Sequence, residues 1–249
     1  MDTEQFRTAV EHAKLEALKE FAYGAGHEIN NPLANIAGRA QTLLKTESDG
    51  EKRKALESIH RQAMRAHGMI ADLMLFARPP ALEPLDFPLP DLVDELIDEF
   101  KPLATDRSVD LTATHADSRG VVCGDRTHLG VAIGALIENA IEAVSPGGEV
   151  NVSWRTAAEQ FEIAVRDNGP GVSAEERERL FDPFYSGREA GRGLGFGLCK
   201  CWRIVTDHGG TITVESPPAA GATFTIALPR PAAVADPGAS TGGAEQTRP

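Results

Sequence analysis

Apolar or small residues recur every three to four positions along two stretches of the first 77 residues. This spacing is typical of amphipathic helices with a seam that packs against other helices. The repeating positions are Leu18, Ala22, Ala25, Ile29, Leu33, Ile36, Ala40 and Leu43, then Leu56, Ile59, Ala63, Ala66, Ile70, Leu73 and Ala77. The short polar segment 45–51 joins the stretches and predicts an antiparallel hairpin. Two helices cannot enclose a core, so the pattern favours a dimeric four-helix bundle.

The helical pattern ends at a proline-rich stretch. Five prolines lie between residues 79 and 90, where they disfavour a helix and predict an extended linker. Residues 1–78 are therefore expected to form an all-α domain. Residues 230–249 are rich in Pro, Gly, Ala and Ser without any periodicity, and they are predicted to be a disordered tail.

Residues 91–229 mix apolar periods of two and 3.6. That mixture predicts an α+β two-layer sandwich, with one mixed sheet under helices. The expected strands are 109–114, 120–123, 149–154, 161–167, 210–216 and 222–228, and the expected helices are 91–104, 126–144, 174–180 and 194–210.

Composition and charge narrow the class of protein. Of 249 residues, 41% are hydrophobic and 25% are charged, the balance of an ordinary soluble protein with a core. The net charge of −12, without a Lys/Arg cluster, argues against nucleic acid or an anionic membrane as the main partner. No signal peptide or membrane-spanning segment is evident, so a cytoplasmic protein is expected. The three cysteines are too few for a disulfide framework or a four-ligand zinc site.

The segment FAYGAGHEINNPL, residues 21–33, places a histidine on the first helix, rotated away from the seam and toward solvent. An isolated exposed histidine usually has no role, but Glu28 follows His27 directly and Asn31 lies one turn further on. A carboxylate can take the proton from one imidazole nitrogen and make the other more nucleophilic. A carboxamide can hold a water beside a phosphoryl group. Pro32 is expected to bend the helix at this turn.

Further residue types suited to nucleotides lie in the second half. VRDNGPGVS follows an expected strand and places Asp167 before Gly169 and Gly171, whose lack of a side chain lets the backbone approach a ligand. Asn139 lies in the middle of an expected helix, where asparagine is unfavourable unless its oxygen has a role such as binding Mg²⁺. Taken singly, these features are better explained by a plain turn and by an asparagine without a functional role.

A glycine-rich loop precedes the last expected helix. GLGFGL places Gly193, Gly195 and Gly197 where free backbone N–H groups and the helix dipole favour phosphate. On its own the loop is equally consistent with close packing.

In combination these stretches resemble the H, N, G1, F and G2 boxes of two-component sensor histidine kinases. The matching residues are His27 and Glu28, Asn139, Asp167 with Gly169 and Gly171, Phe181 to Phe184, and Gly193 with Gly195 and Gly197. The resemblance extends over residues 15–229. It implies a dimeric phosphotransfer bundle joined to an ATP-binding domain of the Bergerat type.

The resemblance also implies a role for individual residues. Asp167 accepts a hydrogen bond from the adenine amino group, and Asn139 helps to hold Mg²⁺. Phe184 begins a stretch similar to a short ATP lid, in which Arg188 stands where a phosphate-contacting lysine is common. The glycine loop and Leu198 after it complete the implied nucleotide site.

The sequence departs from the family pattern in two places. Ala135 stands where a second asparagine is usual, one turn before Asn139, which weakens the expected metal affinity. Only a short stretch precedes the His27 motif, too short for a sensor domain, so a separate sensor partner or a longer parent chain is expected.

The leading interpretation is an ATP- and Mg²⁺-dependent protein-histidine kinase. It phosphorylates His27 and passes the phosphoryl group to an aspartate of a response-regulator receiver domain. Asn31 further predicts phosphatase activity on the phosphorylated regulator. One alternative is a catalytically weak phosphotransfer or scaffold protein of the same architecture, which Ala135 supports. The other alternative is an ATPase without histidine phosphorylation. That class usually carries a glutamate at the position of Ala135 to activate water, and alanine cannot do so.

Overall fold

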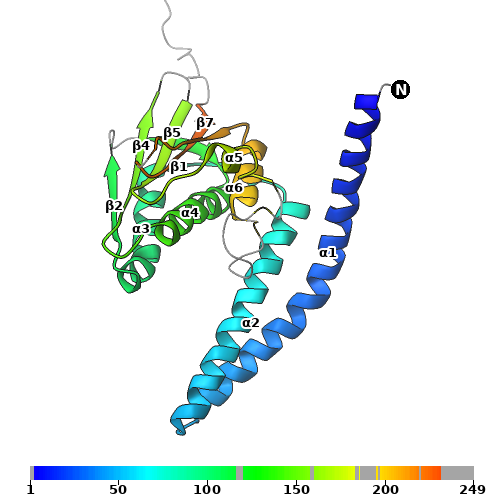
Figure 1. The fold of residues 1–249 in the computed structure, drawn as a ribbon, viewed down its shortest axis with the longest axis vertical. Coiled ribbons are helices and arrows are strands. Elements are labelled where there is room, and N and C mark those ends of the chain that lie inside the picture. The colour runs from blue at the N-terminus through cyan, green and yellow to red at the C-terminus, as the bar shows by residue number, and fades with distance from the viewer. Residues whose placement is uncertain are drawn as a thin grey trace, which may run out of the picture.

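The computed structural model describes residues 3–115, 120–157, 160–182, 185, 195, 197–218 and 220–230. A long helical hairpin leads into a sandwich of helices packed on a sheet (Figure 1). Within these described ranges, no helix combines the length and the apolar character that crossing a membrane requires.

The hairpin consists of α1 (Thr3–Leu44) and α2 (Gly50–Ala77). Asp49 caps α2, because its side chain accepts hydrogen bonds from the free backbone N–H groups of Glu51 and Lys52, at 2.9 and 3.2 Å. This cap fixes the start of α2 directly after the tight connection. The predicted antiparallel hairpin is confirmed.

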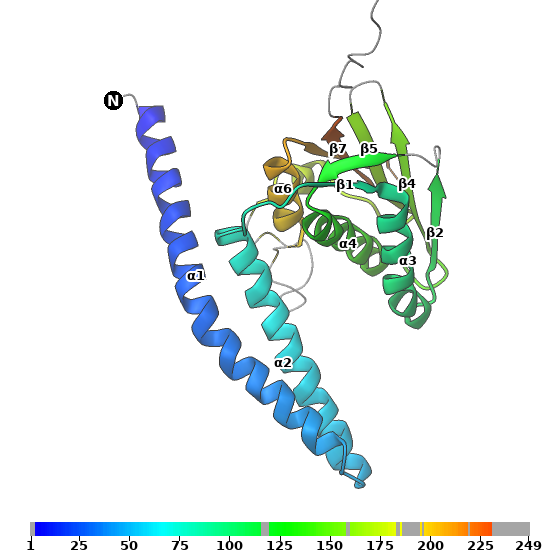
Figure 2. The ribbon, with the colours of Figure 1, turned by 180° about the vertical axis from the view of Figure 1, so that it is seen from behind.

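Small residues form the buried seam between the two helices. Ala37, Ala40 and Ala63 are all nearly inaccessible to solvent, and their short side chains let the helix backbones approach closely. α1 continues through Pro32 without interruption. Figures 1 and 2 show α1 as a curved helix whose N-terminal end diverges from α2.

The second half is the predicted two-layer sandwich. Its main sheet has the strand order β2-β4-β5-β7-β6, in which β2 and β4 are parallel and the other neighbours antiparallel. The strands are β2 (Asp110–His115), β4 (Glu149–Thr156), β5 (Gln160–Asp167), β6 (Thr211–Glu215) and β7 (Thr223–Pro229). The helices are α3 (Leu89–Asp106), α4 (Arg126–Ala143), α5 (Ala174–Arg177) and α6 (Gly197–Asp207).

The core lies between the sheet and helices α3, α4 and α6, which cover one of its faces (Figure 2). Alternate residues of β4, β5 and β7 point into it, as the period of two requires. α4 is buried on most of its circumference and runs through the middle of the helical layer. The α+β fold class predicted from the sequence is confirmed.

Two details of the prediction are wrong. The strand predicted at 120–123 was expected in the single mixed sheet. The structure instead forms β3 (Val121–Gly124), which pairs with β1 (Leu85–Pro88) in a separate two-stranded antiparallel sheet. β1 lies inside the expected linker 79–90, because Phe87 buries its ring in the core. Pro88 tolerates this place since a strand end needs no N–H donor there, and α3 begins at once with Leu89.

Candidate functional site

The His27 turn lies on α1, on the length that faces the C-terminal half of α2. The side chain of His27 lies outside the described residues. Glu28 and Asn31 are exposed, as expected for a surface that another molecule must reach. Asn30, by contrast, is partly buried, and its Nδ2 donates to the sulfur of Met74 on α2 at 3.7 Å. One side of this turn therefore faces solvent and the other packs on α2.

Gly26, directly before His27, marks a close approach of the two helices. A Cβ at Gly26 would lie 2.5 Å from Cγ of Met74 and 3.5 Å from Cγ2 of Ile70. Glycine inside a helix costs roughly 1 kcal/mol relative to alanine, so such a position needs a packing reason. The reason here is the Met74 side chain. Sequence reasoning missed both residues, although a glycine within a helical pattern was a usable signal.

Asp167 ends β5 and is 3% exposed. Its Oδ1 accepts hydrogen bonds from the backbone N–H groups of Gly169, at 2.9 Å, and Ala222, at 3.3 Å. Burial raises the pKa of the Asp167 carboxyl, although these two N–H groups act in the opposite direction. Among the described residues, both of these hydrogen bonds end on Oδ1 of the carboxylate, and they fix its orientation. A buried carboxylate without a cationic partner in the described structure is a typical functional group.

The glycines after Asp167 lie in a tightly packed loop. A Cβ on Gly169 would meet Oδ1 of Asp167 at 2.9 Å and the carbonyl oxygen of Ala143 at 3.2 Å. Gly171 has a φ of +79°, and a Cβ there would lie 2.5 Å from Oγ of Ser216. Both positions therefore disfavour a side chain, because it would collide with the protein's own atoms.

Residues far along the chain support this loop and were missed by sequence reasoning. The hydroxyl of Ser216 donates to the carbonyl of Gly221 at 2.8 Å and accepts from the N–H of Val172 at 2.8 Å. Gly221 has a φ of +77° and lies against the backbone of Asp167. These residues are brought to the site by the pairing of β7 with both β5 and β6, which no local pattern reveals.

We expect Gly221→Ala to disturb Asp167 directly. The new methyl group would collide with the carbonyl oxygen of Asp167, in addition to the strain of a positive φ. The positive φ should cost about 1 kcal/mol and the overpacking about 1–3 kcal/mol. The unfolding free energy should therefore fall by roughly 2–4 kcal/mol. Thermal unfolding measures this loss.

Gly147→Ala provides the matched control, because Gly147 has a φ of +86° but open space around it. It should lose only about 1 kcal/mol. Equal losses in the two variants would contradict a special role of the contact with Asp167.

Asn139 lies partly buried on α4, one turn after buried Ala135. The last turn of α4 reaches Gly169, since the Ala143 carbonyl lies beside it. The structure thus brings the helix of Asn139 to the loop of Asp167. In the described ranges, no cluster of three or more His, Cys, Asp or Glu could hold a metal ion.

The glycine-rich loop is described only in part. Gly195 has a φ of +73°, Gly197 begins α6, and Leu198 packs against the core. Phe184, Arg188 and Gly193 lie outside the described residues. α6 packs beside α4 (Figure 1), so its first turn belongs to the same helical layer as Asn139.

Two family models match the chain. The His Kinase A (phospho-acceptor) domain matches residues 17–81, and the histidine kinase-, DNA gyrase B- and HSP90-like ATPase matches residues 124–232. Together with the fold, these matches define a phospho-acceptor hairpin joined to an ATPase domain.

Known proteins with this arrangement are histidine kinases. The sensor-like histidine kinase SenX3 of Mycobacterium tuberculosis is 34% identical over 231 residues, covering 88% of this chain and 56% of that protein. The sensor histidine kinase ZraS of Escherichia coli is 30% identical over 217 residues, covering 87% and 46%. The chain thus spans about half the length of these relatives.

Solved structures agree. Histidine kinase ThkA, in complex with the response regulator protein TrrA, is 25% identical with a TM-score of 0.64, covering 92% of this chain and 67% of ThkA. Full-length ShkA in complex with AMPPNP has a TM-score of 0.74 at 21% identity, covering 84% and 45%, and supports the fold alone. The chain carries the catalytic core of the two-component histidine kinases, which confirms the family resemblance.

Proposed function

We propose that the chain is a protein-histidine kinase that transfers the γ-phosphoryl group of ATP to His27 and then to an aspartate of a response regulator. One observation carries this proposal: a single chain joins a phospho-acceptor hairpin to an ATPase-like sandwich. In that sandwich, the carboxylate of Asp167 is buried and held in place by two backbone N–H groups. The complex of the similar ThkA with a response regulator supports the second transfer. Incubation with γ-labelled ATP and Mg²⁺ tests the proposal, since a kinase retains label on the protein.

The nucleotide occupies the loops around Asp167 in this proposal. Asp167 accepts from the adenine amino group beside Gly169 and Gly171, where a side chain would collide with Asp167 itself or with Ser216. The remaining nucleotide contacts come from the lid and glycine-loop residues Phe184, Arg188, Gly193, Gly195, Gly197 and Leu198.

Mg²⁺ accompanies ATP in this proposal, and Asn139 is its one protein ligand. Mg²⁺ in nucleotide sites keeps several waters and binds substrate phosphates with only one or two protein oxygens. A single carboxamide oxygen therefore fits, and the absence of an acidic cluster in the described ranges is consistent with it. Bound Mg²⁺ would neutralise charge on the phosphates.

At the phospho-acceptor turn, one imidazole nitrogen of His27 forms the new bond to the γ-phosphorus as the bond to the ADP oxygen breaks. Glu28 is exposed beside His27, and it takes the proton from the imidazole ring as general base. The same phosphoryl group then passes to the regulator's aspartate.

We also propose that the protein dephosphorylates its regulator, with Asn31 orienting the attacking water. Asn31 is exposed one turn from His27, on a side that a receiver domain can approach. Asn31→Ala should keep the phosphorylation of His27 and lose at least about tenfold in regulator dephosphorylation, since a positioned polar group contributes that much or more to catalysis. Assays with purified phospho-regulator measure this rate, and a wild-type rate would contradict the role of Asn31.

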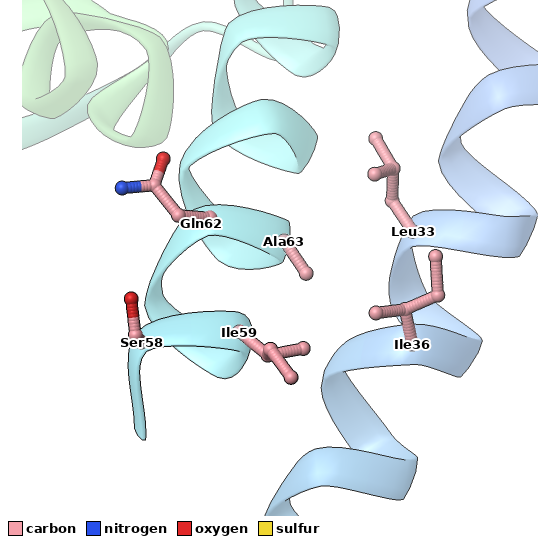
Figure 3. A pocket seen from close by; sticks show the side chains of 6 residues that line it. All are labelled: Leu33, Ile36, Ser58, Ile59, Gln62 and Ala63. Carbon is pink, nitrogen blue, oxygen red and sulfur yellow. The ribbon is translucent and has the colours of Figure 1, made fainter. Parts of the chain in front are cut away.

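A homodimer through the hairpin is the proposed assembly. Between α1 and α2 lies a groove lined by Leu33, Ile36, Ser58, Ile59, Gln62 and Ala63 (Figure 3). Ile36 and Ile59 are 47% and 49% exposed, which is unusual for large apolar residues on adjacent helices. A second hairpin placed on this groove would bury them and complete a four-helix bundle.

Ile59→Asp should therefore abolish the dimer, because it would bury an unpaired charge. Light scattering at micromolar concentration should give the mass of a monomer for this variant and of a dimer for the wild type. Glu57→Gln, an exposed change two residues away, is the control that should stay dimeric. A monomeric wild type would contradict the proposed assembly.

The alternative of a catalytically weak scaffold rests on Ala135, which cannot supply the second oxygen for Mg²⁺. It predicts no retained label despite a folded protein. A cytoplasmic location follows from the proposed substrates, ATP and a response regulator.

A further inference from the structure

An ion pair joins the hairpin to the nucleotide-binding domain. Nζ of Lys200 on α6 lies 2.5 Å from Oδ1 of Asp72 on α2, although the two residues are 128 positions apart. The side chains are 13% and 32% exposed, so the pair is substantially shielded from water. Leu75, one turn after Asp72, packs against the core of the sandwich. Figures 1 and 2 both show α6 beside the C-terminal end of α2.

On the hairpin side, this contact lies at the level of the phospho-acceptor turn. Met74, two residues after Asp72, packs over Gly26 and accepts a hydrogen bond from Asn30. Gly26 and Asn30 lie on either side of His27 in the sequence. A single turn of α2 thus contacts the His27 turn with one face and α6 with another.

On the domain side, the contact lies at the start of α6. Lys200 follows Gly197, the first residue of that helix, by three positions. The glycine-rich loop proposed to hold the ATP phosphates ends at the same place. The ion pair therefore connects the phosphate end of the proposed nucleotide site to the level of His27.

We propose that Asp72 and Lys200 are positioning residues, whose ion pair docks the nucleotide-binding domain on α2 so that ATP is presented at the level of His27. The inference rests on the proposed kinase function and adds to it the contact that aligns the two domains. An exposed ion pair would contribute little, but a shielded pair leaves an uncompensated charge when one partner is removed. Replacing either Asp72 or Lys200 should therefore weaken the docking of the nucleotide-binding domain on α2.

Charge reversal tests the proposal. Lys200→Asp and Asp72→Lys should each lower the autophosphorylation rate at saturating ATP by about tenfold or more, because like charges then face each other. ATP affinity by calorimetry should stay unchanged, since neither residue belongs to the proposed nucleotide site. The double reversal should restore most of the rate. Lys54→Asp is the matched control, because Lys54 forms an exposed pair with Glu51 within α2 and should leave the rate unchanged.

Two further measurements keep the test decisive. Lys200→Gln and Asp72→Asn remove one charge without repulsion and should give smaller losses, so they replace the reversals if those fail to fold. Small-angle scattering of the full chain should show a larger radius of gyration for the single reversals and a compact double reversal.

The outcomes separate this inference from the proposed function. An unlabelled wild type that still expands on charge reversal would reject the kinase function and retain the docking contact. A labelled wild type with unchanged single variants, or with no recovery in the double reversal, would overturn the inference. Faster autophosphorylation in the single variants would also overturn the inference, because the ion pair would then hold the two domains in an arrangement that does not react.

Discussion

Replacing His27 by glutamine is expected to remove all acid-labile, base-stable phosphoryl label from the protein. Glutamine has no ring nitrogen to attack the γ-phosphorus, yet it is tolerated well inside a helix such as α1. ATP affinity should remain that of the wild type, because α1 carries none of the residues around Asp167. Labelling with γ-labelled ATP, followed by acid and base treatment, measures the first effect, and calorimetry measures the second.

The hairpin contains its own controls for this experiment. His60 and His67 lie on α2 and are partly exposed, but neither has an acidic neighbour followed by a polar residue one turn later. His60→Gln and His67→Gln should keep the full label. If the label persists in His27→Gln and disappears in one of these variants, the phosphorylated histidine is the one on α2 and not His27.

The helices and strands were largely predictable because their signals are local. The seam of the hairpin repeats every 3.5 residues and ends where the prolines begin. In the sheet, alternation is strict, as in β5, where Phe161, Ile163 and Val165 are buried in turn. The two errors share one cause. β1 is only four residues long and contains Pro88, so its partner β3 and its burial through Phe87 depend on tertiary packing.

The residues of the candidate site could be picked out from the sequence where they are concentrated in a short motif. Asp167, Gly169 and Gly171 fall within five residues, and the structure gives each a distinct geometric reason. Gly221 and Ala222 complete the surroundings of Asp167 from more than 50 positions away, beyond the reach of any sequence window. The ion pair of Asp72 with Lys200 spans 128 positions and joins two unremarkable charged residues. Motifs therefore indicate the chemistry, whereas the fold determines how the groups are supported and aligned.

Asp167→Asn distinguishes the chemistry of the site from the support that the fold gives it, because this change should greatly weaken ATP binding without destabilising the fold. Asparagine has the same shape, and its Oδ1 can still accept from Gly169 and Ala222. Its amide nitrogen, however, would face the adenine amino group donor to donor. Losing a charged hydrogen bond and leaving that donor unpaired should cost about 3 kcal/mol or more, or roughly 10²-fold in ATP affinity. Calorimetry with ATP and Mg²⁺ measures it, and Asp110→Asn, an exposed change on β2, is the control.

The stability of the same variant tests the electrostatic argument. Burial raises the pKa of Asp167 in the folded protein. A carboxyl shifted in this direction stabilises the fold fully below its unfolded pKa, and this contribution is lost as pH rises through the folded pKa. Above the folded pKa the ionised wild-type side chain therefore destabilises the fold, so at such a pH Asp167→Asn without nucleotide should unfold at the same temperature or a higher one. This advantage of the variant should shrink as pH falls through the folded pKa of Asp167. Added ATP and Mg²⁺ should raise the unfolding temperature of the wild type alone. A variant that loses stability at pH 7, or that ATP still stabilises, would show that Asp167 supports the loop rather than the nucleotide.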